Sequence, residues 1–127
     1  MDDITFGLVE KPVYVRRDAR GTFEEVVNSG RWEGLISGRM AKGAVMGNHY
    51  HHHTIVFFYL LDGRSRIITV DVHTKARREY DIQAGQGFVF RPSEARAIIH
   101  LEDVRFVMLK SHRFDPTVPD LIDYQVS

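Results

Sequence analysis

Short apolar runs rich in Val, Ile, Phe and Tyr alternate with turn-forming residues along the chain. No window of 12 residues keeps an apolar stripe at helical spacing without Gly, Pro or a β-branched run. So many short strands in one domain indicate an all-β closed barrel or jelly roll, which leaves few exposed strand edges. The predicted strands cover residues 4–9, 13–16, 22–27, 35–41, 44–46, 50–53, 55–61, 64–73, 77–82, 87–90, 97–101 and 104–110.

Turn signals separate these strands, and the strongest is Asp62-Gly63 between two apolar runs. An Asp-Gly pair in this setting predicts a tight β-hairpin, because both residues tolerate the positive φ that such turns need. Residues 114–120 carry two of the four prolines and predict an irregular tail. We expect this tail to pack across the barrel surface, with three apolar anchors, Leu121, Ile122 and Tyr124.

Composition narrows the functional classes. The 127 residues are 43% hydrophobic, which is enough for the core of a single domain spanning residues 1–127. Seventeen basic and 17 acidic residues give no net positive charge that would attract nucleic acid. The absence of cysteine removes disulfides, thiol nucleophiles and cysteine metal sites. No apolar run approaches the roughly 20 residues of a membrane span, and the acidic start Met1-Asp2-Asp3 is unlike a signal peptide. We therefore expect a soluble, cytoplasmic domain.

The candidate chemistry is concentrated in residues 47–53, which read Gly-Asn-His-Tyr-His-His-His. On an extended strand His49, His51 and His53 share one face, with neighbours about 6.6 Å apart along the strand. Two such imidazoles converge on one metal ion or substrate only if the strand bends, as it does in a small barrel. One interpretation is an inward-facing histidine pair at the barrel mouth, and the other is a solvated histidine loop.

The spacing around these histidines resembles the first motif of the cupin superfamily. That motif is Gly, five residues, His-x-His, three or four residues, Glu, six residues and Gly. Gly43, the pair His49 and His51, and Gly63 match it in every spacing, but Val56 stands where the Glu belongs. The resemblance implies a small cupin barrel, also called a double-stranded β-helix or jelly roll. In other cupins the Glu that Val56 replaces is normally a metal ligand.

The second cupin motif, Pro-x-Gly-x-x-His, maps onto residues 92–97. Pro92 is kept, Glu94 replaces the Gly, and Ala97 replaces the His, which is another usual metal ligand. Two of the four ligands implied by the resemblance are therefore apolar side chains that bind no metal.

A closer resemblance covers nearly the whole chain. Residues 18–25, Asp-Ala-Arg-Gly-Thr-Phe-Glu-Glu, resemble a signature of the nucleotide-sugar epimerases and ketoisomerases of the cupin superfamily. Residues 47–52 and 114–120 resemble the cupin domain that ends bifunctional capsular polysaccharide enzymes. Those enzymes join a reductase domain to a cupin that epimerises C3 of a keto-sugar nucleotide. Cupins of this kind are commonly homodimers, so the resemblance also implies a homodimer.

The same resemblance assigns substrate contacts to three residues. Arg20 would bind the diphosphate of a nucleotide sugar, which its forked guanidinium suits, while Phe23 and Glu25 would lie near the base. The alternative is a plain hairpin with Gly21 in the turn and Phe23 in the core.

Two kinds of chemistry stay open for the histidines. His49, His51 and, with a bend, His53 would hold Zn²⁺ or Ni²⁺ in a weak, open site completed by water. Alternatively, no cofactor is needed, because a histidine near its ordinary pKa is able to remove the acidic proton beside a ketone. We expect His49 as the base and His51 as its partner in that case.

Acid or oxyanion partners for these histidines are Tyr59 and Arg39, provided that their side chains face inward. The sequence thus predicts an epimerase or ketoisomerase acting on a nucleotide-linked 4-keto sugar in polysaccharide biosynthesis. The alternative is a non-catalytic cupin that binds a small molecule, such as a sugar nucleotide, at a degenerate metal site. A metal-dependent enzyme of another kind, such as a dioxygenase, would need the carboxylate that Val56 replaces.

Overall fold

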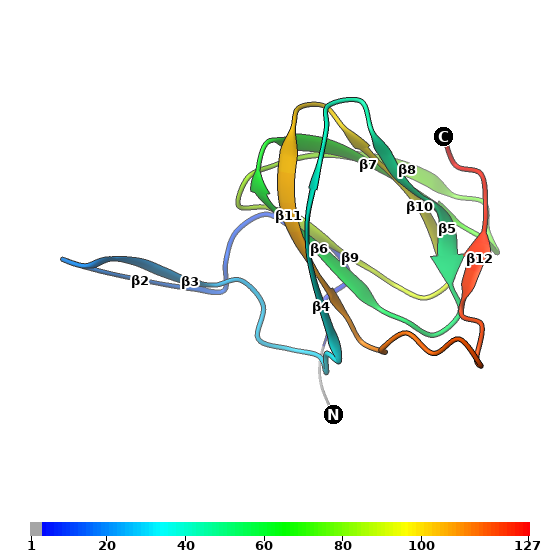
Figure 1. The fold of residues 1–127 in the computed structure, drawn as a ribbon, viewed down its shortest axis with the longest axis horizontal. Coiled ribbons are helices and arrows are strands. Elements are labelled where there is room, and N and C mark those ends of the chain that lie inside the picture. The colour runs from blue at the N-terminus through cyan, green and yellow to red at the C-terminus, as the bar shows by residue number, and fades with distance from the viewer. Residues whose placement is uncertain (1–3) are drawn as a thin grey trace.

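A computed structural model describes residues 4–127. In this part of the chain, two five-stranded antiparallel sheets pack face to face, and a two-stranded ribbon stands apart from them (Figure 1). The strands are β1 (Gly7–Val9), β2 (Tyr14–Asp18), β3 (Gly21–Glu25), β4 (Gly34–Met40), β5 (Val45–His51), β6 (Val56–Asp62), β7 (Arg64–Asp71), β8 (Arg77–Gln83), β9 (Gly87–Phe90), β10 (Glu94–His100), β11 (Val104–Lys110) and β12 (Leu121–Asp123).

The sheet orders confirm the predicted all-β jelly roll. One sheet runs β1-β9-β6-β11-β4 and the other runs β12-β5-β10-β7-β8. Alternate residues of each strand point between the sheets, so β6 sends Val56, Phe58 and Leu60 into the core. These side chains meet Phe88 and Ile67 from neighbouring strands, and all five are buried. Among residues 4–127, no helix is long and apolar enough to cross a bilayer.

The hairpin predicted at Asp62-Gly63 is wrong. Strand β6 pairs with β9 and β11, whereas β7 pairs with β8 and β10, so the chain passes from one sheet to the other at this point. The backbone groups beside the turn find partners elsewhere. The Gly63 carbonyl accepts from the Ala84 N–H at 3.0 Å, and the Arg64 carbonyl accepts from the Leu101 N–H at 2.9 Å. Gly63 bends the chain with a φ of 90°, but the partners of each strand come from distant parts of the chain.

Strand β5 is continuous where two separate strands, 44–46 and 50–53, are predicted. Gly47 and Asn48 have φ values of 99° and 54°, and they form a bulge inside the strand. The register with β10 moves at this point from His49 opposite Arg96 to Gly47 opposite Ala97. A bulge of this kind bends the strand and increases its twist. It supplies the bend that the histidine pair requires.

The tail ends in an additional strand. Strand β12 adds to the edge of the sheet beside β5, with Leu121 opposite His51 and Ile122 opposite Tyr50. Beyond it, the Asn48 side-chain oxygen accepts from the backbone N–H of residues 126 and 127 at 2.9 and 3.0 Å. The bulge on β5 therefore also fixes the end of the described chain.

The ribbon formed by β2 and β3 projects away from the two packed sheets (Figure 1). Every residue of β3 is exposed, and Phe23 keeps 64% of its surface accessible. The interpretation that places Phe23 in the core is therefore wrong. An exposed aromatic side chain on a projecting ribbon is available to a ligand or to a second molecule.

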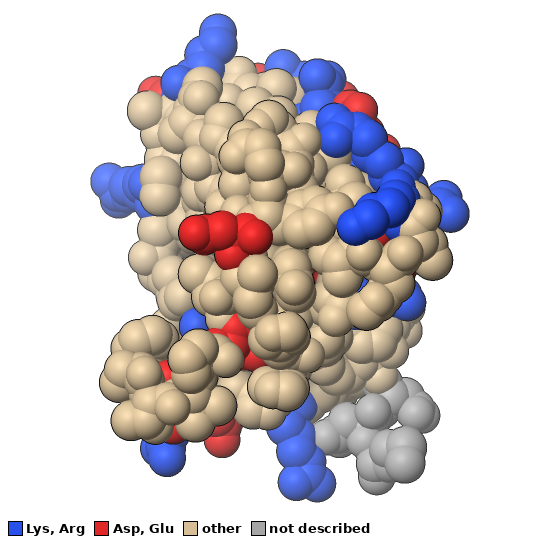
Figure 2. Space-filling view, turned by 90° about the vertical axis from the view of Figure 1, so that its right-hand side faces the viewer, with Lys and Arg blue, Asp and Glu red and all other residues tan. Residues whose placement is uncertain are grey.

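Several charged side chains on the outer face of the sheet that contains β12 form pairs of opposite sign. Figure 2 views this side of the molecule and shows basic groups along one edge with acidic groups among them. Arg66 binds Asp81 at 2.8 Å, and Arg64 binds Glu102 at 2.8 Å. Exposed pairs of this kind contribute little to stability.

Candidate functional site

A cavity of about 180 Å³ lies between the two sheets. Most of its wall is apolar, with Met108 and Val56 from one sheet facing Met46 and Ile98 from the other. Among the described residues, no Asp or Glu lines it. Its titratable side chains are His49, His51, Arg96 and Lys110. The cavity is thus a small apolar space with a positive electrostatic bias.

The two motif histidines enter this cavity together. They share one face of β5, and their ring centroids lie 5.4 Å apart with the rings nearly perpendicular. His51 is buried and His49 is half-buried. The alternative of a solvated loop is wrong for this pair, although His52 and His53, beyond the end of the strand, are exposed.

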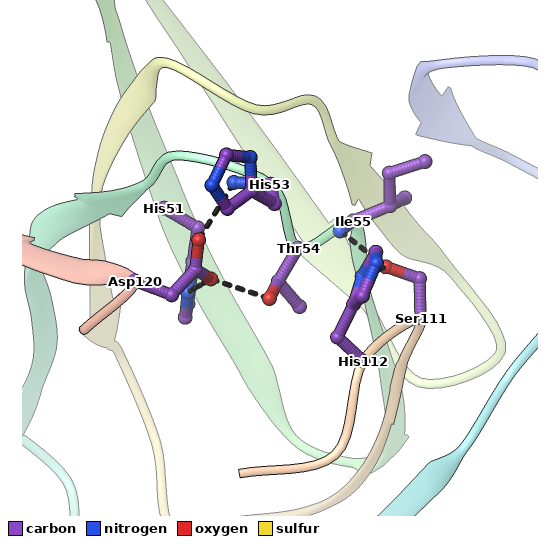
Figure 3. A network of polar contacts seen from close by, with 7 residues as sticks. All are labelled: His51, His53, Thr54, Ile55, Ser111, His112 and Asp120. Atoms are coloured by element: carbon purple, nitrogen blue, oxygen red, sulfur yellow. Dashed lines mark hydrogen bonds and ion pairs between the residues drawn. The ribbon is translucent and has the colours of Figure 1, made fainter. Parts of the chain in front are cut away.

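His51 is oriented by a carboxylate from the tail. Its Nδ1 lies 2.9 Å from Oδ2 of Asp120. An ionised carboxylate only accepts hydrogen bonds, so Nδ1 carries the proton and Nε2 keeps its lone pair. Asp120 is held in turn by the Thr54 hydroxyl at 2.5 Å and by the backbone N–H of His53 at 2.7 Å (Figure 3). The network fixes both the ring orientation and the tautomer of His51.

Burial and charge set the protonation states of this pair. Burial, followed by the charge of Arg96, lowers the pKa of His51 to about 4, although the bond to Asp120 acts in the opposite direction. Burial alone would raise the pKa of Asp120, but the hydrogen bonds from Thr54, the His53 backbone and His51 outweigh it and hold that pKa well below its ordinary value. Near neutral pH the pair is therefore a neutral imidazole bound to a carboxylate.

His49 has the same tautomer for a different reason. Its Nδ1 lies 3.1 Å from the carbonyl oxygen of Gly47, which only accepts, so Nε2 again keeps the lone pair. Burial and the nearby charge of Arg96 lower the pKa of His49. The cavity thus contains two neutral imidazoles, and only one of them has a carboxylate behind it.

Arg96 is the fixed cation of the cavity. It lies opposite His49 in the β5–β10 register, and only 2% of its surface is accessible. Its guanidinium carbon sits 4.4 Å from the ring centroid of Phe90. In the part of the chain that the structure describes, neither Nε nor Nη2 has a hydrogen-bond partner. Burial lowers the pKa of Arg96 to about 10, so the group stays charged at neutral pH.

The residues present do not fit the metal site of the cupin pattern. Within residues 4–127, no three His, Cys, Asp or Glu side chains come together as a metal-binding group. Val56 lines the cavity where a carboxylate is expected. Ala97 packs with Tyr50 on the opposite face of the sheet, so the inward residue of this motif is Arg96. The exposed His53 does not join the set predicted with His49 and His51.

Two residues expected to help the histidines do not line the cavity. Their predicted role depended on facing inward, and this condition is not met. Arg39 is exposed on β4, because its neighbours at 38 and 40 alternate onto the other face. Tyr59 lies on the face of β6 opposite Phe58, with its ring 5.9 Å from that of Phe57.

The predicted nucleotide-binding residues lie on the projecting ribbon. Arg20 and Phe23 line a shallow surface hollow that shares no residue with the cavity. Arg20 is exposed and pairs with Asp18 at 2.7 Å. Glu25 is exposed at the end of β3. The structure therefore does not bring Arg20, Phe23 and Glu25 to the histidines of the same chain.

A larger hollow of about 630 Å³ adjoins the cavity outside the barrel. The two spaces share three lining residues, His51, Lys110 and Leu121. The tail forms much of the outer wall, including Arg113 and Phe114. A ligand too large for the inner cavity therefore has room to continue past His51 into this outer hollow.

Sequence reasoning missed three of the groups that shape the site. Arg96 was detectable as a single charge between two alanines at the start of an apolar strand. Lys110 was detectable as the charge that ends another apolar strand. Asp120 lies inside the tail segment that carried the resemblance, but nothing in its local sequence links it to His51, which is 69 positions away.

The fold and the site define the class of protein as a jelly-roll cupin with a histidine pair and a buried arginine in its cavity. The chain belongs to the polysaccharide biosynthesis C-terminal domain family, whose profile matches residues 16–122. This match confirms the resemblance seen in the sequence. Comparison with curated proteins gave no significant match.

Solved structures support the same fold. CapF, the capsular polysaccharide assembling protein of Staphylococcus aureus, is 24% identical, with a TM-score of 0.68 over 91% of this chain and 35% of CapF. The dTDP-4-dehydrorhamnose 3,5-epimerase of Elizabethkingia anophelis is 18% identical, with a TM-score of 0.72 over 87% of this chain and 70% of that one. The Legionella pneumophila 3,5-epimerase RmlC, solved with dTDP-4-keto-L-rhamnose, is 17% identical, with a TM-score of 0.71 over 87% and 68%. The chain spans about a third of the length of CapF.

Proposed function

We propose that this domain is an epimerase or ketoisomerase that moves a proton at a carbon beside the ketone of a nucleotide-linked 4-keto sugar. The observation that carries the proposal is the His51–Asp120 pair in a small, otherwise apolar cavity. A neutral imidazole held by a carboxylate in one tautomer is the arrangement that general-base catalysis requires. Several structurally similar proteins are sugar-nucleotide epimerases, which supports the proposed substrate class. The family supports a role of this domain in polysaccharide biosynthesis.

We assign the two histidines different roles. His51 is the base, because Asp120 stabilises the imidazolium that forms when Nε2 takes a proton. His49 is the partner that exchanges a proton with the second position or the opposite face of the sugar. This order is the reverse of the one expected from the sequence, and the carboxylate behind His51 is the reason. No step in this scheme runs through a metal.

The inner cavity accommodates only the reacting part of such a substrate. Ligand pockets for whole drug-sized molecules measure about 300–1,000 Å³, whereas this cavity measures about 180 Å³. We place the sugar ring against His51 and the nucleotide in the outer hollow. Lys110 borders both spaces and suits the diphosphate between them.

Deuterium exchange tests the proposed activity. The protein is incubated in D₂O with a thymidine- or uridine-linked 4-keto sugar, and proton NMR follows the carbons beside the ketone. We expect deuterium to enter one of these carbons at a rate proportional to protein concentration, with the epimer or isomer as product. Tight binding with no exchange above the protein-free rate would reject the enzyme and favour the non-catalytic binding cupin.

We further propose that the ribbon acts on the site of a second copy in a homodimer. The ribbon projects from the barrel, and the hollow around Arg20 is separate from both cavities of its own chain. A partner's ribbon is therefore able to bring Arg20 and Phe23 over the outer hollow, where a diphosphate and a base would lie.

Mixed dimers test this arrangement. Arg20→Ala and His51→Gln each remove one half of the composite site, so each pure protein is expected to lose exchange activity. Co-expression of the two variants is expected to restore activity, because one site of the mixed dimer is then intact. A mixture of Arg20→Ala with Phe23→Ala is the control, since both changes lie on the ribbon and no site is restored. A monomer in light scattering, or no recovery in the first mixture, would reject the shared site.

A further inference from the structure

We propose that Arg96 binds the substrate oxygen that becomes negatively charged during proton transfer, so that a guanidinium takes the electrophilic role that a metal ion has in the cupin pattern. This inference rests on the proposed function. It assigns a direct catalytic contact to Arg96, which occupies a variable position of the second motif next to Ala97, where the usual metal ligand is lost.

The geometry places this cation where the oxygen would lie. Arg96 faces His49 across the β5–β10 pair, and it lines the same cavity as His51. Ala97 occupies the position on β10 where the motif has its histidine, and the Ala97 side chain lies on the other face of the sheet. The side chain that β10 sends into the cavity at this level is therefore the guanidinium.

The unused donors of Arg96 point to an anionic ligand. Nε–H and Nη2–H lie on one edge of the planar guanidinium, and neither has a partner among residues 4–127. Glu94 and Asp120 act on Arg96 through space, but neither lines the cavity. A buried charge with unused donors is costly to a fold. An oxygen bearing negative charge would satisfy these donors when the site is occupied.

The reaction step balances with solvent water as the only further reagent. Nε2 of His51 takes the proton from the carbon beside the ketone, and the electron pair of that C–H bond forms a carbon–carbon double bond. The carbonyl electron pair moves onto oxygen, and the resulting enolate oxygen accepts from the Nε–H and Nη2–H of Arg96. Solvent water first supplies a proton to Nε2 of His49, because the resting proton of this ring is on Nδ1. The resulting imidazolium gives that proton to the opposite face of the carbon, which restores the ketone and inverts the carbon, and His51 releases its own proton to water. Nothing is oxidised or reduced.

The charge of Arg96 also links the two stages of this step. It lowers the pKa of both His49 and His51, after burial as the larger cause, which keeps their Nε2 atoms unprotonated. An enolate beside Arg96 offsets that charge and makes a protonated His51 less unfavourable. The N–H donors of Arg96 bind a charge that develops only during the reaction. They therefore lower the activation free energy of proton transfer rather than strengthen binding of the substrate in its ground state.

Kinetics of Arg96→Met, with Arg78→Met as the matched control, test the proposal. Methionine keeps an unbranched stem beside Phe90 and removes the unpaired charge, so we expect this variant to fold. Arg78 is exposed on β8, and its loss changes net charge by the same amount. We expect Arg96→Met to lower kcat for exchange by about 100-fold or more with little change in KM, Arg96→Lys to show an intermediate loss, and Arg78→Met to match the unmodified protein. Exchange within threefold of the unmodified rate in Arg96→Met would overturn the assignment.

A binding measurement separates this proposal from the proposed function. Sodium acetate, a planar anion, is titrated into ¹⁵N-labelled protein, and the Nε–H signal of Arg96 is followed by NMR. We expect saturable movement of that signal in the unmodified protein and in Arg78→Met, and the neutral analogue acetamide is expected not to cause it. If the unmodified protein shows no deuterium exchange but acetate binds, the epimerase is rejected and the anion site stands alone. If acetate leaves the Arg96 signal unmoved, the oxyanion site is overturned.

Discussion

Replacing His51 with Gln is expected to lower the rate of deuterium exchange by about 10²–10⁴-fold, the range for loss of a positioned acid or base. Gln has a similar reach and is able to bond Asp120, but it has no basic nitrogen. His52→Gln is the matched control, because His52 is exposed and contacts Tyr50 edge-on on the other face. Equal activities for the two variants would show that His51 is not the base.

Asp120→Asn extends this test to the tautomer of His51. The amide oxygen is able to accept from the His53 backbone N–H in place of Oδ1, while the amide nitrogen in place of Oδ2 donates to the Thr54 hydroxyl oxygen and to Nδ1 of His51, so the fold is expected to survive. It also permits His51 to carry its proton on Nε2, where no proton can then be accepted. We therefore expect a loss of exchange comparable to that of His51→Gln, with a native-like thermal transition.

The pH profile gives a further check on His51. Only its neutral form accepts a proton, and its pKa is lowered to about 4 by burial and by Arg96. The value of kcat/KM reports groups of the free protein, so it should be level above about pH 5 and fall as pH drops through about 4. A fall centred near 6.5 would show that the base is a histidine with an ordinary pKa.

Gly47→Ala is expected to have the largest effect on stability among changes next to the site. Gly47 has a φ of 99°, and a Cβ added there would lie 2.5 Å from the carbonyl oxygen of Arg96. Both the backbone conformation and the clash oppose a side chain, so we expect a loss of about 2–4 kcal/mol in the free energy of unfolding. Urea denaturation measures this loss.

Gly43→Ala provides the matched control for Gly47→Ala. Its φ is 88°, but nothing lies within 4 Å of an added Cβ, so it reports the cost of the conformation alone. We expect a loss of about 1–2 kcal/mol for this variant. Equal losses at the two positions would show that the close approach of β10 to the bulge does not constrain the chain.

The local pattern predicted most strands because strand formation here depends on residues that are near in sequence. Short apolar runs between turn residues identified β6 and β11, and the cupin spacing identified His49 and His51 as a pair. The wrong hairpin at Asp62-Gly63 and the unpredicted strand β12 have one cause. Which strand pairs with which is decided by contacts between residues far apart in the chain, and a turn motif does not specify them.

The sequence by itself determined an all-β cupin barrel with a histidine pair and without the usual metal ligands, because motif spacing and short apolar runs between turn residues are local properties. The tertiary structure decided the rest of the site. It brought Asp120 to His51 from 69 positions away and used the bulge at Gly47 to bend β5. It also turned Arg96, rather than Ala97, toward the histidines. Which face of a strand points inward depends on register, and register is fixed only when the sheets pack.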